Sequence, residues 1–371
     1  MQVSPDPVAV NDAVVRLAML QDMPIFYAGL VVENTTRCNA KCAMCYQSAG
    51  PKGSDTWGTQ SLTTAEIKRV IAEASTIETL YPRFHLSGGE AFIDVDGCIE
   101  LFTAAREAGF LDITTTTNAY WANKPDRARA VCERLRAAGV TSMEISWDYW
   151  HKPYVSGDAV SNCLEACSEF EIETNLRILC TKSHSYSEAL SFLRPEALAR
   201  ASRVSGGPVF ATGRAAKMIP PEDFHRQNNI EGNCHSVLNL TVNARGNVYP
   251  CCAGLDQTDY VFGNVREASL DAIAERLNRS PVVRTVVFSG IAALAPLLER
   301  SGIDVGREYN GICHMCWRIF SDPECVRALD DELEKATQRA LSRALDRLEH
   351  SRIETAVDDH DPHCCAHAEA D

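Results

Sequence analysis

Short apolar runs alternate with longer amphipathic stretches between about residues 27 and 215. The strand-like runs lie at 28–33, 83–87, 112–117, 142–146, 173–180 and 209–212. Between them, apolar residues recur with helical spacing at 64–80, 98–108, 125–138 and 156–170. Thr63 and Glu66 have the spacing of a capping box at the start of the first of these helices. The pattern predicts repeated βαβ units and a parallel sheet, with ligands at the C-terminal ends of the strands.

The pattern changes after about residue 220. Apolar runs at 237–242 and 246–249 flank a short polar turn, which indicates a hairpin, and helical spacing follows at 269–278. A charged amphipathic helix is predicted over 323–353, and the acidic, His- and Cys-rich end of the chain reads as a solvated tail. We therefore expect five segments: an extension at 1–26, a first domain at 27–220, a second at 221–326, a helix at 327–355 and a tail at 356–371.

Charge and cysteine content limit the partners and the kinds of chemistry that we expect of this protein. The 371-residue chain has 36 basic and 50 acidic residues, a net charge of −14, so we expect neither nucleic acid nor a membrane as the main partner. The N-terminus lacks the basic region of a secretory signal, which indicates a cytoplasmic protein. Sixteen cysteines are many for a reducing compartment, and their grouping points to metal or redox chemistry.

The first cysteine group follows the first predicted strand directly. Cys38, Cys42 and Cys45 have the spacing C-x3-C-x2-C. Three thiolates around one [4Fe–4S] cluster leave the fourth iron without a protein ligand, and that iron is free to bind a cofactor or substrate. A structural zinc site normally closes with four ligands, so a zinc site that borrows a distant cysteine is the alternative.

This spacing, followed by Tyr46, resembles the signature of the radical S-adenosylmethionine (SAM) superfamily. The resemblance implies that the open iron chelates SAM, and that SAM cleavage gives a 5′-deoxyadenosyl radical that abstracts a substrate hydrogen. One βα unit later, Gly88, Gly89 and Glu90 resemble the family motif that holds the methionine amino group, with Ala91 where proline is usual. The implied fold class is α/β: a partial (β/α)6 TIM-like barrel followed by a small α+β auxiliary iron–sulfur domain.

Polar residues at later strand ends extend the implied SAM site. Asn118, Ser146 and Arg177 lie where related enzymes contact SAM, and an arginine suits pairing with its carboxylate. For each of them, capping of a strand end is the structural alternative. His151, close to Asp148, is a candidate acid–base group, although we expect a partly exposed loop histidine.

A second cysteine group supplies four more thiolates. Cys234, Cys251, Cys313 and Cys316 would complete another [4Fe–4S] cluster, with a four-cysteine zinc site as the alternative. Their placement around the hairpin resembles the auxiliary-cluster extension called SPASM, or its shorter form Twitch. Cys325 is a further candidate ligand, but no clear seventh cysteine follows, so the count favours the single-cluster Twitch form.

Cys252 follows one of these ligands directly. In enzymes that this chain resembles, the residue after that ligand can act on the substrate, and a thiol there would return a hydrogen atom to a substrate radical. The alternative is that Cys252 is itself the ligand or a buried bystander.

The resemblance implies modification of a ribosomally made peptide, by epimerisation or by a thioether or carbon–carbon cross-link. We expect a flavodoxin- or ferredoxin-type electron donor. Because only about 27 residues precede the first strand, leader recognition would need a separate protein or the catalytic domain itself. A small-molecule dehydrogenase or decarboxylase acting on a sugar or aminocyclitol is the second hypothesis, and a non-enzymatic metal scaffold is the third.

Overall fold

The computed structural model describes residues 23–226, 230, 234, 238–252, 254–306, 308–336, 338, 339 and 342. The predicted extension at 1–26 and the C-terminal helix lie partly outside these residues, and the tail at 356–371 lies wholly outside them. Of the region predicted as a C-terminal helix, residues 323–336 are described as helical.

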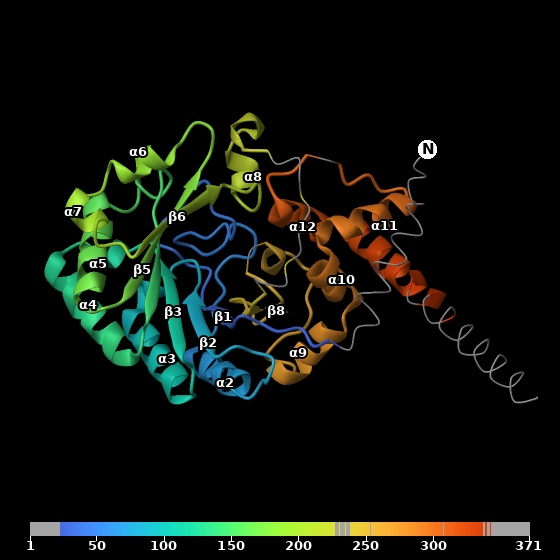
Figure 1. The fold of residues 1–371 in the computed structure, drawn as a ribbon, viewed down its shortest axis with the longest axis horizontal. Helices are drawn as coiled ribbons and strands as arrows, with labels where there is room; N and C mark the ends of the chain where they lie inside the picture. Colours follow the sequence, from blue (N-terminus) through green and yellow to red (C-terminus); the bar gives the residue numbers. More distant parts are fainter. Residues whose placement is uncertain are drawn as a thin grey trace, which may run out of the picture.

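Within the described residues, one sheet of eight strands forms the centre of the molecule (Figure 1). Its order is β6-β5-β4-β3-β2-β1-β7-β8, and all neighbours are parallel except the last pair. The strands are β1 (Leu30–Glu33), β2 (Arg83–Ser87), β3 (Asp112–Thr117), β4 (Ser142–Ser146), β5 (Glu173–Cys180), β6 (Arg203–Pro208), β7 (Leu240–Val242) and β8 (Val248–Tyr249). The predicted parallel α/β sheet is confirmed, and its first six strands form the partial barrel.

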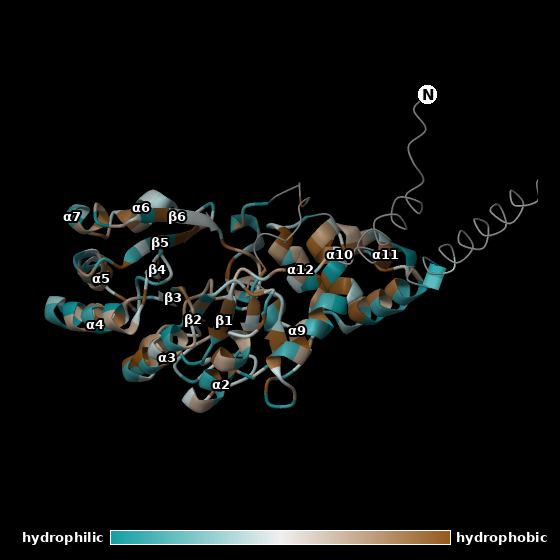
Figure 2. Ribbon diagram, turned by 60° about the horizontal axis from the view of Figure 1, so that its bottom comes forward, coloured by the Kyte–Doolittle hydropathy of each residue, from teal (hydrophilic) through white to brown (hydrophobic). Residues whose placement is uncertain are grey.

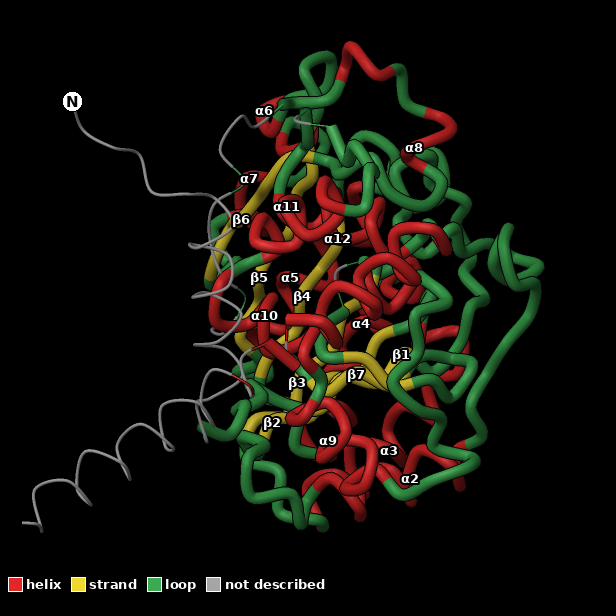
Figure 3. Tube along the Cα trace, turned by 90° about the vertical axis from the view of Figure 1, so that its right-hand side faces the viewer, coloured by secondary structure: helices red, strands yellow, loops and turns green. Residues whose placement is uncertain are grey.

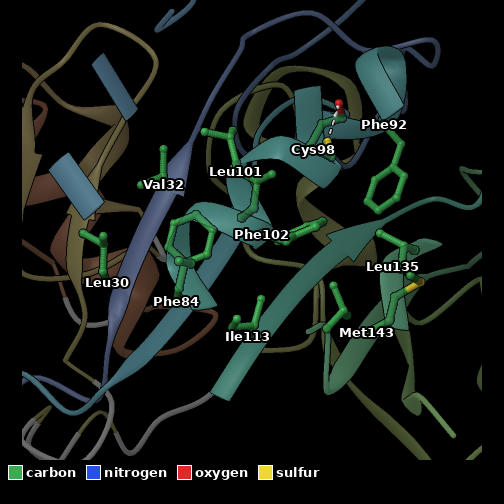
Figure 4. Packing of buried hydrophobic residues seen from close by; sticks show 14 of the residues in the cluster. Leu30, Val32, Phe84, Phe92, Cys98, Leu101, Phe102, Ile113, Leu135 and Met143 are labelled. Carbon is green, nitrogen blue, oxygen red and sulfur yellow. Dashed lines mark hydrogen bonds between the residues drawn. The ribbon is translucent and has the colours of Figure 1, made fainter. Parts of the chain in front are cut away.

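Four helices cover one face of this sheet (Figures 1 and 2). They are α2 (Thr64–Ala74), α3 (Val95–Glu107), α4 (Pro125–Ala138) and α5 (Gly157–Glu169). Their apolar sides pack on alternate residues of the strands, and Figure 4 shows Phe84 and Ile113 against Leu101 and Phe102 of α3. The core therefore lies between the sheet and its helices, and the opposite face of the strands is left for polar side chains.

The first predicted helix begins as its pattern indicates but ends earlier. The capping box is confirmed, since Thr63 Oγ1 accepts from the Glu66 backbone at 3.2 Å and Glu66 Oε2 accepts from the Thr63 backbone at 2.7 Å. The helix stops at Ala74 instead of residue 80, because the chain turns back there so that Leu80 pairs with Tyr27 beside the sheet.

The sixth strand was predicted wrongly. It spans Arg203–Pro208, and residues 209–212 follow it. Its sequence contains two glycines and a proline and forms an edge with one neighbour, so it lacks the apolar signal of a central strand. A Cβ at Gly206 would overlap the Tyr186 ring, which explains why a glycine is needed there.

The second half of the chain extends the same sheet. The predicted hairpin is confirmed where it is described: β7 lies beside β1 (Figure 3), and β8 folds back on β7 around Gly246, whose φ is +83°. The helices that follow are α9 (Leu270–Arg279), α10 (Pro281–Ser289), α11 (Ala295–Arg300) and α12 (Ile312–Phe320). Helices α10, α11 and α12 enclose a second hydrophobic cluster with residues 323–336, while the buried side of α9 joins the core of the barrel.

Short helices complete the described part. They are α6 (Tyr186–Leu190), α7 (Pro195–Leu198) and α8 (Ala215–Met218), with 3-10 turns η1 (Ala91–Asp94), η2 (Tyr120–Ala122), η3 (Pro221–Asp223), η4 (Leu255–Gln257) and η5 (Ile291–Leu294). Within the described ranges, every helix is too short or too polar to cross a bilayer.

Candidate active site

The first cysteine group forms a tight loop at the C-terminal end of β1. Cys38 and Cys42 are buried and Cys45 is partly buried. The Cys45 backbone donates to the Cys42 carbonyl at 3.2 Å, and the Cys38 backbone donates to the Gly50 carbonyl at 3.0 Å. These bonds fold the loop so that its three thiols gather at one end of the sheet.

The buried side chain of Arg214 holds the cysteine loop through hydrogen bonds to its backbone. Its guanidinium donates to the carbonyls of Cys42, Ser48 and Ala49 at 2.5–2.9 Å, and it pairs with Asp55 at 2.7 Å. A buried guanidinium with all these partners fixes the shape of the loop. Sequence reasoning missed Arg214, because it lies about 170 residues away from the cysteines and belongs to no local motif.

The glycines after β2 lie directly under the cysteine loop. The Gly89 backbone donates to the Thr35 carbonyl at 2.6 Å, and the Glu90 backbone donates to the Arg37 carbonyl at 2.8 Å. A Cβ at Gly88 would stand 2.6 Å from Asn34 Oδ1, and one at Gly89 would overlap the Arg37 carbonyl oxygen. The motif therefore brings the end of β2 into backbone contact with the loop, which no residue with a Cβ would allow.

Glu90 and Asn118 connect the next strand to this contact. The Glu90 carboxylate accepts from the Asn118 backbone at 2.8 Å and from Thr117 Oγ1 at 2.7 Å, and burial raises its pKa. Asn118 Nδ2 donates to Asn39 Oδ1 at 2.9 Å and lies 3.8 Å from Cys38 Sγ. Asn118 also caps its own turn by accepting from the Tyr120 backbone at 3.0 Å. The structure thus places both predicted SAM contacts against the cysteine loop.

His151 is buried, which corrects the expectation of a partly exposed loop histidine. Its Nδ1 lies 2.9 Å from Asp148 Oδ1, which also caps the turn by accepting from the Trp150 backbone. Burial opposes a charge on His151, but Asp148 and Cys42 outweigh it and raise its pKa well above the usual value. The Asp148–His151 pair therefore stands beside the cysteine loop.

Ser146, the last residue of β4, is the register partner of Arg177 within β5, and both are partly exposed. They lie on the face of the sheet opposite the packed core, where Asn175 Nδ2 donates to Glu144 Oε2 at 3.1 Å. Arg177 lowers the pKa of Glu144 against the larger effect of burial, which raises it. The roles of Ser146 and Arg177 in SAM binding stay predictions.

The second cysteine group also assembles in space. Burial raises the pKa of Cys316 well above its ordinary value, and Cys251, Cys313 and Cys234 add to the shift. Burial and Cys234 likewise raise the pKa of Cys313 to about 11. The four predicted thiols therefore share one region between the hairpin and α12.

Cys325 has different surroundings. It is buried in the second hydrophobic cluster, and after burial the groups that raise its pKa most are Asp322 and Glu324. For Cys313 and Cys316, by contrast, neighbouring thiols are the groups that raise the pKa most after burial. Cys325 therefore behaves as a packed core residue.

Cys252 faces a different set of groups from its neighbour Cys251. Burial raises its pKa well above the ordinary value, followed by Asp256, Cys251 and Glu33. Cys252 also contributes to the raised pKa of Tyr46, which follows Cys45. Cys252 thus lies between the second cysteine group and the first.

A pair of buried carboxylates, which sequence reasoning missed, lies beside Cys252. Glu33 ends β1 and is hydrogen-bonded to Asp256 of η4, while Gln257 Nε2 donates to both, at 3.4 Å and 2.5 Å. Burial and the charge of Asp256 raise the pKa of Glu33 well above its usual value. Two buried carboxylates in contact hold a shared proton. The two carboxylates lie far apart in the chain, so no local sequence pattern predicts that they meet.

Both thiol groups suit iron–sulfur clusters. Burial, Glu90 and the neighbouring thiols raise the pKa of Cys38, which means that its thiolate form is unfavourable in this loop. Bound iron cations would stabilise that thiolate. Burial and the three neighbouring thiols likewise raise the pKa of Cys316, so bound cations would stabilise its thiolate as well. Within the described ranges, no group of three or more His, Cys, Asp or Glu side chains, the cysteine groups included, is already placed around a single metal-ion position.

The fold and the two thiol groups define a radical enzyme that carries more than one iron–sulfur site. Residues 32–194 match the family model of the radical SAM superfamily, and residues 234–317 match that of the SPASM iron–sulfur cluster-binding domain. The chain belongs to the radical SAM superfamily and carries a C-terminal SPASM domain. It uses a [4Fe–4S] cluster and SAM, and its SPASM domain binds auxiliary iron–sulfur clusters.

One curated protein and one solved structure are similar to most of the chain. A protein of Bacillus subtilis (strain 168), named putative peptide biosynthesis protein YydG, is 23% identical over 310 residues, 81% of this chain and 94% of its own length. The solved structure of native anSMEcpe with bound AdoMet superposes with a TM-score of 0.53 at 13% identity, covering 85% of this chain and 99% of the other. The structural match supports the fold, the partial barrel with its C-terminal extension.

Proposed function

We propose that this enzyme modifies a ribosomally made peptide, and that the modification is an epimerisation in which Cys252 donates a hydrogen atom. The position of Cys252 carries the proposal, because this thiol lies outside the four-cysteine group and beside the first cysteine loop. The name of the Bacillus subtilis relative, a putative peptide biosynthesis protein, supports a peptide substrate.

When bound at Cys38, Cys42 and Cys45, the cluster and SAM supply a radical able to abstract a hydrogen atom from a peptide Cα. The chain's own part follows that abstraction. Cys252 donates its S–H hydrogen to the opposite face of the planar carbon radical, which inverts the centre and leaves a thiyl radical. One electron from an external one-electron reductant and one proton then restore the thiol.

The surroundings of Cys252 suit this role. Its high pKa keeps sulfur protonated near neutral pH, and a hydrogen-atom donor must carry its hydrogen. The hydrogen-bonded Glu33–Asp256 pair beside it holds a proton in a buried setting. Glu90, Asn118 and Arg177 would hold and orient SAM at the strand ends.

Replacing Cys252 with alanine tests the proposal. The reconstituted Cys252→Ala enzyme should keep its iron content and still form 5′-deoxyadenosine, but should yield at least tenfold less epimerised peptide by chiral amino-acid analysis. Cys251→Ala is the matched control, and it should lose auxiliary iron. Unchanged epimerisation by Cys252→Ala would remove the donor role, and loss of its iron would make Cys252 the cluster ligand instead.

A further inference from the structure

Two cavities meet on the surface beside the cysteine loop. The first has a volume of about 450 Å³ and the second about 750 Å³, and Ser48 and Lys217 line both. Aromatic side chains line the first cavity: Trp57, Tyr260, Trp317 and Phe320. Each cavity has the size of a small-ligand site, so two that share walls suit an extended chain better than one compact molecule.

The second cavity is positively charged although the whole protein is acidic. Four cations line it, Lys41, Lys152, Arg214 and Lys217, against a single carboxylate, Asp55. Asp55 is already paired with Lys41 at 3.1 Å and Arg214 at 2.7 Å. Two cations are therefore left to attract an anion, in a chain whose net charge is −14.

The two remaining lysines are open to solvent. Within the described part of the chain, the Lys217 side chain has no hydrogen bond or ion pair, and Lys152 Nζ lies 3.6 Å above the Phe192 ring. Exposed Tyr149 and Tyr154 stand in the same cavity, and Tyr149 stacks on His184 with ring centroids 3.4 Å apart. This combination offers charge pairing together with flat apolar surface.

We propose that the two cavities form one peptide-binding groove and that the second cavity, lined by Tyr149 and Tyr154, binds an acidic stretch of the substrate peptide. The inference rests on the proposed peptide function and adds the substrate's chemical class. Tyr46 links the groove to the chemistry, because it lines the first cavity, donates to Glu33 at 3.1 Å and lies within electrostatic reach of Cys252. An acidic stretch held at the lysines would place the following residues along the first cavity.

The test uses reconstituted holoenzyme and two short fluorescein-labelled peptides, one glutamate-rich and one with glutamine at the same positions. We expect the glutamate peptide to bind roughly tenfold more tightly by fluorescence anisotropy at about 0.1 M salt, with the preference shrinking at higher salt. Lys217→Glu should remove most of the preference, with unchanged iron content and circular dichroism. The matched control is Lys124→Glu, the same charge reversal at an exposed lysine that lines neither cavity.

Equal binding of the two peptides, or an unaltered preference in Lys217→Glu, would overturn the inference. Tighter binding of a labelled oligonucleotide than of the glutamate peptide would also overturn it, because the cations would then serve a polyanion. The proposed function is tested separately. If the enzyme epimerises an uncharged peptide as well as an acidic one, the function stands and the acidic specificity falls; if it epimerises neither peptide although the glutamate peptide binds more tightly, the function fails and the acidic groove stands.

Discussion

At the scale of the residue, the site depends on close backbone contact between two loops. Gly88 and Gly89 let the end of β2 donate hydrogen bonds into the loop of Cys38, Cys42 and Cys45. Glu90 then orders the end of β3 through Thr117 and the Asn118 backbone. The thiols are positioned by these backbone bonds together with the hydrogen bonds from Arg214.

Substituting one of these glycines should disturb the cluster. In Gly89→Ala, the new Cβ would overlap the Arg37 carbonyl oxygen and displace the cysteine loop. We expect iron to fall by about four atoms per chain, the content of one [4Fe–4S] cluster, and 5′-deoxyadenosine formation to fall at least tenfold. Gly50→Ala is the control in the same loop, since its Cβ would meet nothing closer than 3.5 Å. Full iron and normal SAM cleavage in Gly89→Ala would contradict this account.

At the scale of the element, α2 ties the barrel to the segment before α9. Glu66 pairs with Arg266 at 2.6 Å, Arg69 donates to the Val265 carbonyl at 2.6 Å, and Glu73 accepts from the Leu270 backbone at 2.7 Å. One face of a single helix therefore fixes the start of α9 while its apolar face packs on the sheet. Glu66 has two roles, because it also completes the capping box.

Glu66→Gln should therefore weaken both the cap and this junction. We expect the free energy of unfolding at neutral pH to fall by about 1 kcal/mol, measured by anaerobic urea denaturation. Glu78→Gln, at an exposed position just beyond the helix, should change it by less than about 0.5 kcal/mol. Equal decreases in the free energy of unfolding for the two substitutions would contradict the stabilising role of Glu66 at the cap and the junction.

The same residue predicts a pH dependence. Arg266 and the Thr63 backbone lower the pKa of Glu66 from 4.5 to about 2. The folded protein thus binds this proton at lower pH than the unfolded chain, so the stabilisation is complete above pH 4.5 and is lost as pH falls towards 2. In Glu66→Gln this part of the acid destabilisation should be absent.

How far the sequence predicts the structure depends on whether the signal is local. Cys38, Cys42 and Cys45, the glycine motif and the first five strands are defined by neighbours in the chain, and all were found where the pattern predicts them. The sixth strand was missed because Gly206, Gly207 and Pro208 carry no strand signal, although the sheet edge accepts them.

Long-range contacts account for the rest. Arg214 on the cysteine loop and Asp256 on Glu33 join residues more than 150 positions apart, so neither has a spacing to recognise. His151 lies in a loop as expected, but its burial was missed, because only the fold shows that Asp148 and Cys42 lie against it. Cys325 shares a cysteine-rich stretch with Cys316, yet its surroundings are those of the core.

At the scale of the whole molecule, the SPASM domain is continuous with the barrel. β7 and β8 extend the barrel sheet beside β1, so the second thiol group and Cys252 stand next to the strand that precedes the first cysteine loop. Glu33 and Asp256, one from each half, meet at this junction. The arrangement brings the radical source and the proposed hydrogen donor to one place.

The ligand set of the second half can be measured directly. Cys316→Ala should lose about four irons per chain while the first site still cleaves SAM, because the four thiols that include Cys316 form their own group. Cys325→Ala is the matched control and should keep all its iron, since Cys325 packs in the core. Iron loss in Cys325→Ala would make it a ligand after all.

One measurement tests the central claim most directly: mass spectrometry of a candidate peptide after anaerobic turnover with SAM in deuterium oxide. The account predicts a gain of one deuterium with no other mass change, accompanied by 5′-deoxyadenosine, because the solvent-exchanged thiol of Cys252 supplies the new hydrogen. Loss of two hydrogens from the peptide, or turnover without incorporation of solvent deuterium, would contradict it.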